Sequence, residues 1–381
     1  MTALHRRPLA ATALISLAAV VGCAGPDDPA AGMPSAPGSA ASSGTIGPSG
    51  SGDTPAEPGP LTGTAVDVAT GLDAPWSIVF LGRTPLVSER DSGRIREVAR
   101  DGSSRTIGVV ADVDHGGEGG VLGLAVDGRD RLYVYSTGAD GNRIQRFEVT
   151  GQPGQLVLGA LETILDGLPS ARVHNGGRIA FGPDGMLYAG VGDAGDRSDA
   201  QDLESLGGKI LRMTPDGAVA AGNPFPGSLV YSYGHRNVQG IDWAADGTMF
   251  ASEFGQNTWD ELNIIEPGGN YGWPIVEGIA GGDEFIDPVQ QWRPAKASPS
   301  GIDVIDGTVF IANLRGEVLR AVPVAAPDTA RDFFTSEYGR IRDVALSPDR
   351  TLWFLTNNTD GRGTARPGDD RIVAVDAGLP D

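Results

Sequence analysis

Cysteine and basic side chains are scarce in this chain of 381 residues. Its single cysteine, Cys23, excludes an intramolecular disulfide and any cysteine-rich metal cluster. Lysine and arginine number 29 against 49 aspartates and glutamates, which gives a formal net charge of −20 at pH 7. Binding of nucleic-acid phosphates needs a concentrated basic surface, and the sequence contains no segment that would supply one. The composition therefore argues against a nucleic-acid-binding protein.

No segment after residue 22 is apolar enough to cross a membrane. The basic stretch at residues 5–7 precedes an apolar run at residues 8–22, which is shorter than the ~20 residues that span a bilayer. This pattern predicts a secretory signal peptide rather than a permanent anchor. The run ends in the letters VVGC, which resemble a bacterial lipobox, and the resemblance implies cleavage before Cys23 and a diacylglycerol group on its sulfur. The alternative is a plain signal peptide with an incidental cysteine.

Large hydrophobic residues are also rare in residues 24–62, which consist mainly of alanine, glycine, proline, serine and aspartate. Such a composition is typical of a flexible tether. We therefore expect three parts in the chain. They are a lipoprotein signal peptide at residues 1–22, a tether at 23–62 and a folded domain at 63–381.

Glycine and proline are abundant, with 57 and 27 residues. Both disfavour long helices, whereas short strands joined by tight turns tolerate them. Hydrophobic residues make up 40% of the chain, which is enough to form a sizeable core. We expect a globular domain made of many short strands.

The folded part contains six copies of one pattern. Each copy has a short apolar strand, a turn, a second strand, a glycine or polar break and a third strand. Successive copies are about 53 residues apart, near the spacing of propeller blades of four strands each. The first strands of the copies fall at residues 77–80, 123–126, 178–181, 240–243, 301–304 and 343–346.

This repeat predicts an all-β fold, a six-bladed β-propeller. A β-sandwich is the competing fold, and six repeats of this regularity disfavour it. Only about 35 residues follow the last of the six first strands, too few for a complete blade. We therefore predict that residues 64–68 add the missing outer strand, because closing the ring removes the two exposed sheet edges of an open array.

The polar residues that stand out in the repeats share one position in the blade. They lie just before first strands or between second and third strands, and these connections open on the same face of a propeller. The register predicts that they surround one central channel, and a concave site of convergent polar groups is the default binding site. These residues are Glu118, His174, Asp193, Arg236, Asn237, Gly255, Gln256, Trp292, Asn313, Leu314, Arg315, Arg340 and Arg342.

Arginine dominates this set. Four guanidinium groups come together in a chain of net negative charge: Arg236, Arg315, Arg340 and Arg342. Because guanidinium groups bind carboxylates in a bidentate manner, the cluster predicts a ligand with several negative charges. His174 carries an imidazole, the side chain best suited to act as a general base near neutral pH.

Several longer motifs occupy these positions. They are GEGGVLG at residues 117–123, HNGGRIAFGPDG at 174–185, VGDAG at 191–195, YSYGHRNVQG at 231–240, DELNIIE at 260–266, GGNYGWP at 268–274 and GRIRDV at 339–344. Together they resemble the glucose/sorbosone dehydrogenase family over residues 65–376. Its members are aldose dehydrogenases that depend on pyrroloquinoline quinone (PQQ) and are built on a six-bladed propeller.

The resemblance implies catalytic roles for two residues. His174 would take the proton of the sugar C1 hydroxyl while hydride passes from C1 to the quinone. Arg236 would stabilise the negative charge that develops on the quinone oxygen. The contacts to PQQ that the resemblance implies are those of Glu118, Asn237, Trp292, Arg315, Arg340 and Arg342.

The resemblance also implies calcium sites. Calcium prefers oxygen ligands, so backbone carbonyls, cofactor oxygens and water can form its shell. The carbonyls of Gly255 and Gln256 would bind a calcium ion that bridges to PQQ. Glu261 and the carbonyl of Tyr271 would hold a second, structural ion.

The sequence departs from the family pattern at several positions. Val173 stands where an aspartate is common, so an acid that could orient the imidazole of His174 is missing. Arg315 replaces a lysine that contacts the cofactor, and Gln256 replaces a proline of the calcium loop. Glu118 stands where glucose-oxidising members have glutamine. The long inserted loops of the glucose-specific enzymes are absent, which favours a monomer with an open pocket.

We expect a lipid-anchored, extracytoplasmic dehydrogenase that uses PQQ and calcium to oxidise aldose sugars to lactones and passes electrons to a quinone or cytochrome. One alternative is a binding or scaffold propeller that has lost this chemistry. Another is a calcium-dependent lactonase. Such an enzyme needs several acidic metal ligands, and the acids expected on this rim are only Glu118 and Asp193, so the sequence disfavours it. A nicotinamide enzyme would need a Rossmann unit, and the sequence has no βαβ pattern.

Overall fold

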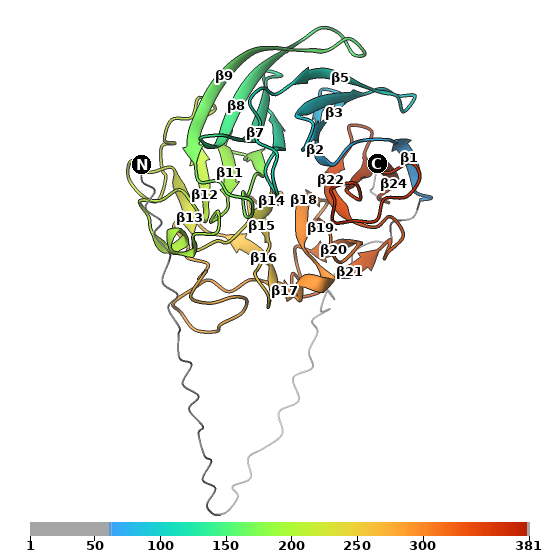
Figure 1. The fold of residues 1–381 in the computed structure, drawn as a ribbon. Helices are drawn as coiled ribbons and strands as arrows, with labels where there is room; N and C mark the ends of the chain where they lie inside the picture. Colours follow the sequence, from blue (N-terminus) through green and yellow to red (C-terminus); the bar gives the residue numbers. More distant parts are fainter. Residues whose placement is uncertain (1–60, 62, 379–381) are drawn as a thin grey trace, which may run out of the picture. The chain divides into compact units, whose positions relative to one another are not determined.

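Six four-stranded sheets form a ring in the computed structural model of the chain (Figure 1). The structure describes residue 61 and residues 63–378. The expected signal peptide, the lipid attachment site Cys23 and almost all of the expected tether lie outside this part. The sheets confirm the all-β fold and the six-bladed propeller. Their first strands lie toward the middle of the ring and contact one another in ring order.

The strands of each blade follow one another from the middle of the ring outward. The inner strands are β2 (Pro75–Leu81), β6 (Val121–Val126), β10 (Ile179–Phe181), β14 (Val238–Trp243), β18 (Pro299–Ile305) and β22 (Ile341–Leu346). The second strands are β3 (Thr84–Glu89), β7 (Leu132–Gly138), β11 (Leu187–Val191), β15 (Met249–Glu253), β19 (Thr308–Asn313) and β23 (Thr351–Thr356). The third strands are β4 (Arg94–Val98), β8 (Gly141–Thr150), β12 (Lys209–Met213), β16 (Asp260–Ile265), β20 (Val318–Pro323) and β24 (Ile372–Asp376). The outer strands are β5 (Ser104–Val109), β9 (Val157–Leu168), β13 (Val230–Tyr233), β17 (Gln290–Trp292), β21 (Arg331–Phe333) and β1 (Val66–Ala69). Two short 3-10 helices, η1 (Arg197–Gln201) and η2 (Pro294–Lys296), lie in connecting loops.

The last blade is completed by a strand from the beginning of the domain. β1 pairs antiparallel with β24, and Asp67 stands opposite Val373. Arg371, just before β24, also pairs with Asp67 at 3.0 Å between Nη1 and Oδ2. The closing strand predicted at residues 64–68 is therefore confirmed, and it runs from Val66 to Ala69.

Carboxylates on inner strands join one blade to another. Asp303 Oδ2 on β18 accepts the backbone N–H of Leu346 on β22 at 2.5 Å, and Asp343 Oδ2 on β22 accepts that of Ile78 on β2 at 2.9 Å. Asp343 also forms an ion pair with Arg178, which precedes β10, at 3.0 Å. Blades three and six are opposite each other in a ring of six, so this ion pair crosses the central channel.

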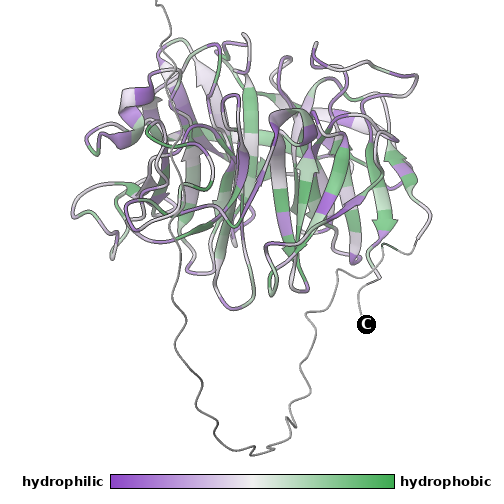
Figure 2. Cartoon of the chain, turned by 90° about the horizontal axis from the view of Figure 1, so that it is seen from below, coloured by the Kyte–Doolittle hydropathy of each residue, from purple (hydrophilic) through white to green (hydrophobic). Residues whose placement is uncertain are grey.

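Hydrophobic side chains pack between neighbouring blades. In one cluster, Leu86 and Ile95 of the first blade pack with Leu124 and Leu132 of the second. Figure 2 shows hydrophobic residues along the strands and hydrophilic residues in the loops at their ends. Because each blade buries its apolar surface against its neighbours, an open ring would expose one such surface at each end.

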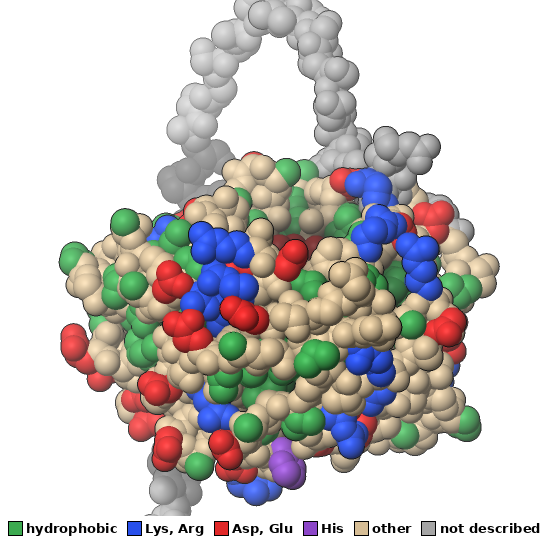
Figure 3. All heavy atoms as spheres, turned by 90° about the horizontal axis from the view of Figure 1, so that it is seen from above, with side chains coloured by type: hydrophobic (Ala, Val, Ile, Leu, Met, Phe, Trp, Pro, Cys, Tyr) green, Lys and Arg blue, Asp and Glu red, His purple; other side chains and the backbone are tan. Residues whose placement is uncertain are grey.

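Charged side chains of both signs share the surface of the propeller. In the face drawn in Figure 3, lysine and arginine occur in small groups beside aspartate and glutamate. One ion pair of the propeller joins Arg146 Nη1 to Asp216 Oδ1 at 2.6 Å. Within the described part of the chain, none of the helices is both long and apolar enough to span a bilayer.

Deletion of residues 1–70 tests the closing strand, because it removes β1 and leaves β24 as an open edge. We expect the Tm to fall by about 5 °C or more, since each kcal/mol lost shifts the Tm of a domain of this size by roughly 2–4 °C. Deletion of residues 1–60 keeps β1 and is the matched control. Circular dichroism melts measure both Tm values, and equal values would contradict the closing role of β1.

Candidate active site

Loops from five blades line one cavity of about 270 Å³ on the face predicted from the repeats. The structure brings nine of the expected rim residues to its wall, namely Glu118, His174, Arg236, Asn237, Gly255, Gln256, Leu314, Arg315 and Arg340. Five further residues complete the wall, namely Phe254, Asp260, Pro294, Ser298 and Arg362. The register of the repeat therefore located the cavity from positions that are far apart in the sequence.

The imidazole of His174 is hydrogen-bonded through both ring nitrogens. Nδ1 lies 2.7 Å from Asp193 Oδ1, and Nε2 lies 2.7 Å from Arg236 Nη2. A guanidinium can only donate, so Nε2 accepts, and the imidazole is neutral with its proton on Nδ1. An unprotonated Nε2 at the cavity wall is the arrangement that a general base requires.

Asp193 supplies the acid that the sequence led us to regard as missing. The expectation drawn from Val173 is wrong. Asp193, in the loop after β11, follows His174 by 19 residues in the sequence, and its carboxylate contacts the imidazole. Asp193 Oδ2 also accepts from Trp273 Nε1 at 2.8 Å, and Oδ1 accepts from the Gly195 N–H at 2.8 Å. Burial raises the pKa of Asp193, but the hydrogen bonds from His174 and Gly195 outweigh it and hold the pKa below its usual value.

The backbone of His174 is held in an unusual conformation. Its φ of 56° lies in the left-handed region, which residues other than glycine rarely adopt. Its N–H donates to Glu118 Oε2 at 2.8 Å. Its carbonyl packs so closely against Gly192 that a Cβ there would lie 1.9 Å from the oxygen. The acid and the glycine together therefore fix the position of the imidazole.

Arg236 connects His174 to the loop that follows β15. Its Nη1 donates to the carbonyls of Phe254 at 3.0 Å and Gly255 at 2.6 Å. Its backbone N–H donates to the buried Glu253. Burial lowers the pKa of Arg236, and among the described residues its Nε finds no hydrogen-bond partner. The side chain therefore keeps a donor for a ligand.

Arg340 lines the cavity, whereas the neighbouring Arg342, which we also expected there, is not part of its wall. Arg340 Nη2 pairs with Asp360 Oδ2 at 3.0 Å. Arg342 is 3% exposed, and within residues 63–378 it has no acid at ion-pair distance; its Nη1 donates to Gln239 Oε1 at 2.8 Å. Burial lowers the pKa of Arg342 to about 9. A buried cation without an acid in contact favours an anionic ligand nearby.

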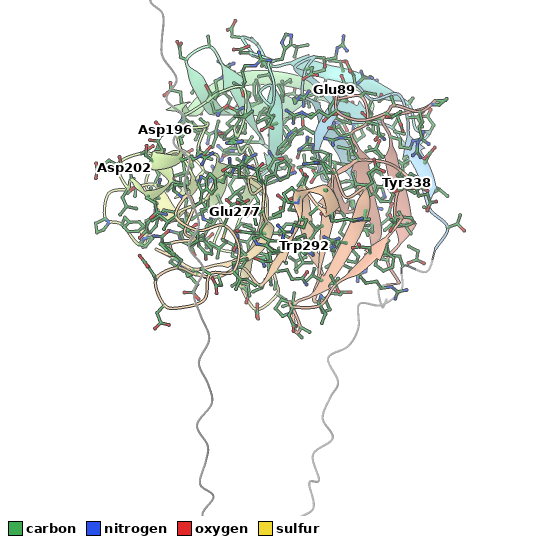
Figure 4. All side chains as sticks on the ribbon, turned by 60° about the horizontal axis from the view of Figure 1, so that its bottom comes forward. Glu89, Asp196, Asp202, Glu277, Trp292 and Tyr338 are labelled. Atoms are coloured by element: carbon green, nitrogen blue, oxygen red, sulfur yellow. The ribbon has the colours of Figure 1, made fainter. Side chains whose placement is uncertain are left out.

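Trp292 does not have the position expected for it. Trp292, labelled in Figure 4, ends β17, the outer strand of the fourth blade, and stands opposite Asp260. Arg320 lies over its ring at 4.6 Å from the centroid. The segment with η2 separates Trp292 from the first strand of the next blade, so the side chain is not part of the cavity wall.

Glu261 and Tyr271, which we expected at a second calcium ion, also lie outside the cavity wall. Glu261 Oε1 accepts from the Gly278 N–H at 2.7 Å. Burial and the neighbouring Glu253 raise the pKa of Glu261. Tyr271 stacks on His235, with 4.7 Å between the ring centroids. No cluster of three or more His, Cys, Asp or Glu side chains suited to a metal occurs in the described part, and the second calcium stays a prediction.

Arg362 is a cavity residue that the sequence reasoning missed. It lies in the loop between β23 and β24, and its Nη1 pairs with Glu118 Oε1 at 3.1 Å. The pair joins loops of the second and sixth blades at the cavity wall. Its position in the blade could have identified it. Arg362 lies between the second and third strands, and the same connection of other blades contains the expected site residues Gly255 and Arg315.

Two buried arginines allow a matched test of unpaired charge. Arg178→Met would leave Asp343 buried without its partner, so we expect the free energy of unfolding to fall by about 3–5 kcal/mol. Arg342→Met removes a cation that contacts no acid among the described residues, and stability should stay unchanged or rise. Urea unfolding followed by tryptophan fluorescence measures both variants. An equal loss in the two would show that Arg342 is not an uncompensated charge.

Comparisons with known proteins agree with this geometry. A sequence model of the family described as "Glucose / Sorbosone dehydrogenase" matches residues 72–365. The PQQ-bound aldose sugar dehydrogenase of Streptomyces coelicolor is 51% identical to this chain, covers 83% of it and 99% of its own length, and superimposes with a TM-score of 0.79. A putative oxidoreductase (glucose dehydrogenase) of Thermus thermophilus is 40% identical, with coverage of 82% and 99% and a TM-score of 0.74.

A curated relative gives the same result. The aldose sugar dehydrogenase YliI of Escherichia coli K12 is 29% identical over 76% of this chain and 89% of its own length. The region that the family model matches contains the cavity residues from Glu118 to Arg362. The chain therefore belongs to the glucose/sorbosone dehydrogenase family.

Proposed function

We propose that the protein is a PQQ-dependent aldose dehydrogenase that oxidises the C1 hydroxyl of aldose sugars to lactones. The observation that carries the proposal is the placement of His174 at the wall of an arginine-lined cavity, with Nε2 2.7 Å from Arg236 Nη2 and Nδ1 2.7 Å from Asp193 Oδ1. Relatives that are sugar dehydrogenases support it, and one of them was solved with PQQ bound. Electrons would then leave for an extracytoplasmic quinone or cytochrome.

The residues of the cavity fit a quinone that carries several carboxylates. In the part of the chain that the structure describes, Nε of Arg342 and Nδ2 of Asn237 are buried N–H groups without a partner. Arg315, Arg340 and Arg342 would hold the carboxylates. Asn237 and Glu118 would contact other polar groups of the cofactor. The chemistry that bound PQQ supplies is the acceptance of a hydride by its quinone.

His174 Nε2 would take the proton of the sugar C1 hydroxyl. For this transfer, the hydroxyl must replace Arg236 Nη2 as the hydrogen-bond partner of Nε2. Asp193, 2.7 Å from Nδ1, would then stabilise the positive charge on the imidazolium. Arg236 would remain beside the reacting atoms as a preplaced cation that stabilises developing negative charge.

The loop after β15 would hold a calcium ion. Its carbonyls at Phe254 and Gly255 already accept hydrogen bonds from a cationic group, because Arg236 Nη1 donates to both. Backbone carbonyl oxygens are ligands that calcium prefers. Gly255 and Gln256 would bind the ion through their carbonyls, and a glutamine in place of proline leaves that carbonyl in the chain.

His174→Ala tests the proposed base. In protein loaded with PQQ and calcium, we expect kcat for aldoses with an artificial electron-accepting dye to fall about 10²- to 10⁴-fold, because the proton acceptor is lost. PQQ uptake, followed by absorbance, should persist. His115→Ala, which replaces an exposed imidazole outside the cavity wall, is the control and should keep its activity.

Two results would count against this function. Unchanged turnover in His174→Ala would exclude the imidazole as the base. A wild-type chain that takes up no PQQ would favour the binding or scaffold propeller instead.

We further propose that the mature chain is extracytoplasmic and is anchored to the cell membrane by a lipid on Cys23. The basic stretch, the apolar run at residues 8–22 and the VVGC ending support this. Metabolic labelling with a clickable fatty acid tests it, because Cys23 is the only thiol in the chain. The wild type should be labelled and Cys23→Ser should not, and equal labelling would contradict the anchor. The monomeric state expected from the sequence stays a prediction.

A further inference from the structure

A single carboxylate oxygen organises the loop between β15 and β16. Oε1 of Glu277, labelled in Figure 4, accepts four consecutive backbone N–H groups. They come from Gln256 at 2.6 Å, Asn257 at 3.0 Å, Thr258 at 2.9 Å and Trp259 at 3.1 Å. Successive N–H groups that converge on one point form an anion-binding nest. Here the chain fills the nest with its own acid.

The same peptide groups carry carbonyls of the cavity. In a trans peptide the N–H and the preceding C=O point in opposite directions. The N–H groups of Gln256 and Asn257 belong to the peptides whose carbonyls are those of Gly255 and Gln256. Because the N–H groups point toward Glu277, these carbonyls point away from Glu277. On the side of the loop away from Glu277, the Gly255 carbonyl accepts from Arg236 Nη1 at 2.6 Å.

The loop closes tightly around Glu277. The Gly255 N–H donates to Asp260 Oδ1 at 2.9 Å, which fixes the start of the turn. A Cβ at Gly255 would lie 1.6 Å from the Trp259 carbonyl and 2.9 Å from Glu277 Oε1. The backbone at this point therefore has no room for a side chain, and the peptide orientations are set by the acid.

The carboxylate of Glu277 is in direct contact with all four of these peptide groups. A charge that accepts a hydrogen bond from a peptide polarises that peptide and makes its carbonyl a stronger acceptor. The carboxylate therefore both orients the loop carbonyls and increases their negative charge.

We propose that Glu277 is a positioning residue for the cation that the Gly255 and Gln256 carbonyls bind. It acts from behind the loop, and its side chain is not part of the cavity wall. The proposal rests on the proposed calcium site and adds to it a residue that supplies none of the expected ligand atoms. Replacement of Glu277 would weaken cation binding while every ligand carbonyl remains in the chain.

Terbium(III) luminescence tests this proposal. Terbium is a calcium-like probe whose emission is excited through a nearby indole, and Trp259 lies in the loop itself. In titrations of the full chain without PQQ, we expect Glu277→Gln to bind terbium about 10-fold more weakly than the wild type and Glu277→Ala about 10- to 100-fold more weakly. Calcium should compete with the signal, and Trp259→Phe should remove it, which assigns the emission to this loop.

Glu284→Gln is the matched control. It removes the same charge from an exposed position in the connection between β16 and β17, to which Glu277 also belongs, and it should bind terbium as the wild type does. Hydrogen exchange gives a second measurement: the amides of residues 256–259 should exchange faster in both Glu277 variants, while those of β16 keep their protection. A general loss of structure would instead affect both segments.

Each outcome decides the proposal. Equal terbium affinity in the wild type and Glu277→Ala would overturn it and leave the proposed function intact. An equal loss in Glu284→Gln would overturn it as well, because the effect would then come from net charge. A wild type that binds neither terbium nor calcium at this loop would remove the calcium site and this proposal with it.

Discussion

The buried arginines near the cavity include one whose positive charge the described part of the chain does not neutralise, Arg342. Two other buried arginines have an acid in contact, Arg178 with Asp343 and Arg340 with Asp360, each at 3.0 Å. Arg342 meets only uncharged partners among the residues described, although the whole chain carries a net charge of −20. Burial of an unpaired cation lowers stability. An anionic cofactor with several carboxylates would offset that loss, and this connects the electrostatics of the site to its proposed chemistry.

Ring closure makes such a site possible from short local elements. His174 and Arg236 are 62 residues apart in the sequence, yet their side chains lie 2.7 Å apart because equivalent loops of adjacent blades meet at the channel. Three groups of the site are each held in place by a neighbouring acid. Asp193 holds the imidazole, Glu253 holds the backbone of Arg236, and Glu277 holds the carbonyl loop. The cavity is therefore arranged before any ligand enters, as catalysis by preplaced charges requires.

The sequence predicted those features that repeat in each blade. The strand pattern predicted the propeller and the closing strand, and the position of His174 and Arg236 within their blades placed them on one rim. Features that depend on the path of one loop were not predictable. Asp193 reaches the imidazole in place of an acid at residue 173, and the connection after Trp292 moves that side chain away from the rim. Glu277 contacts an N–H that lies 21 residues earlier in the chain, and no spacing rule predicts such a contact.

The most direct test of this account is calorimetric titration of PQQ into the calcium-loaded chain and into Arg342→Met. The account predicts saturable binding to the wild type and an affinity at least about 10-fold lower in the variant, because a charge-assisted contact to a carboxylate is lost. Equal affinities in the two proteins, or no binding to the wild type, would contradict the claim that the unpaired charge of Arg342 serves an anionic cofactor.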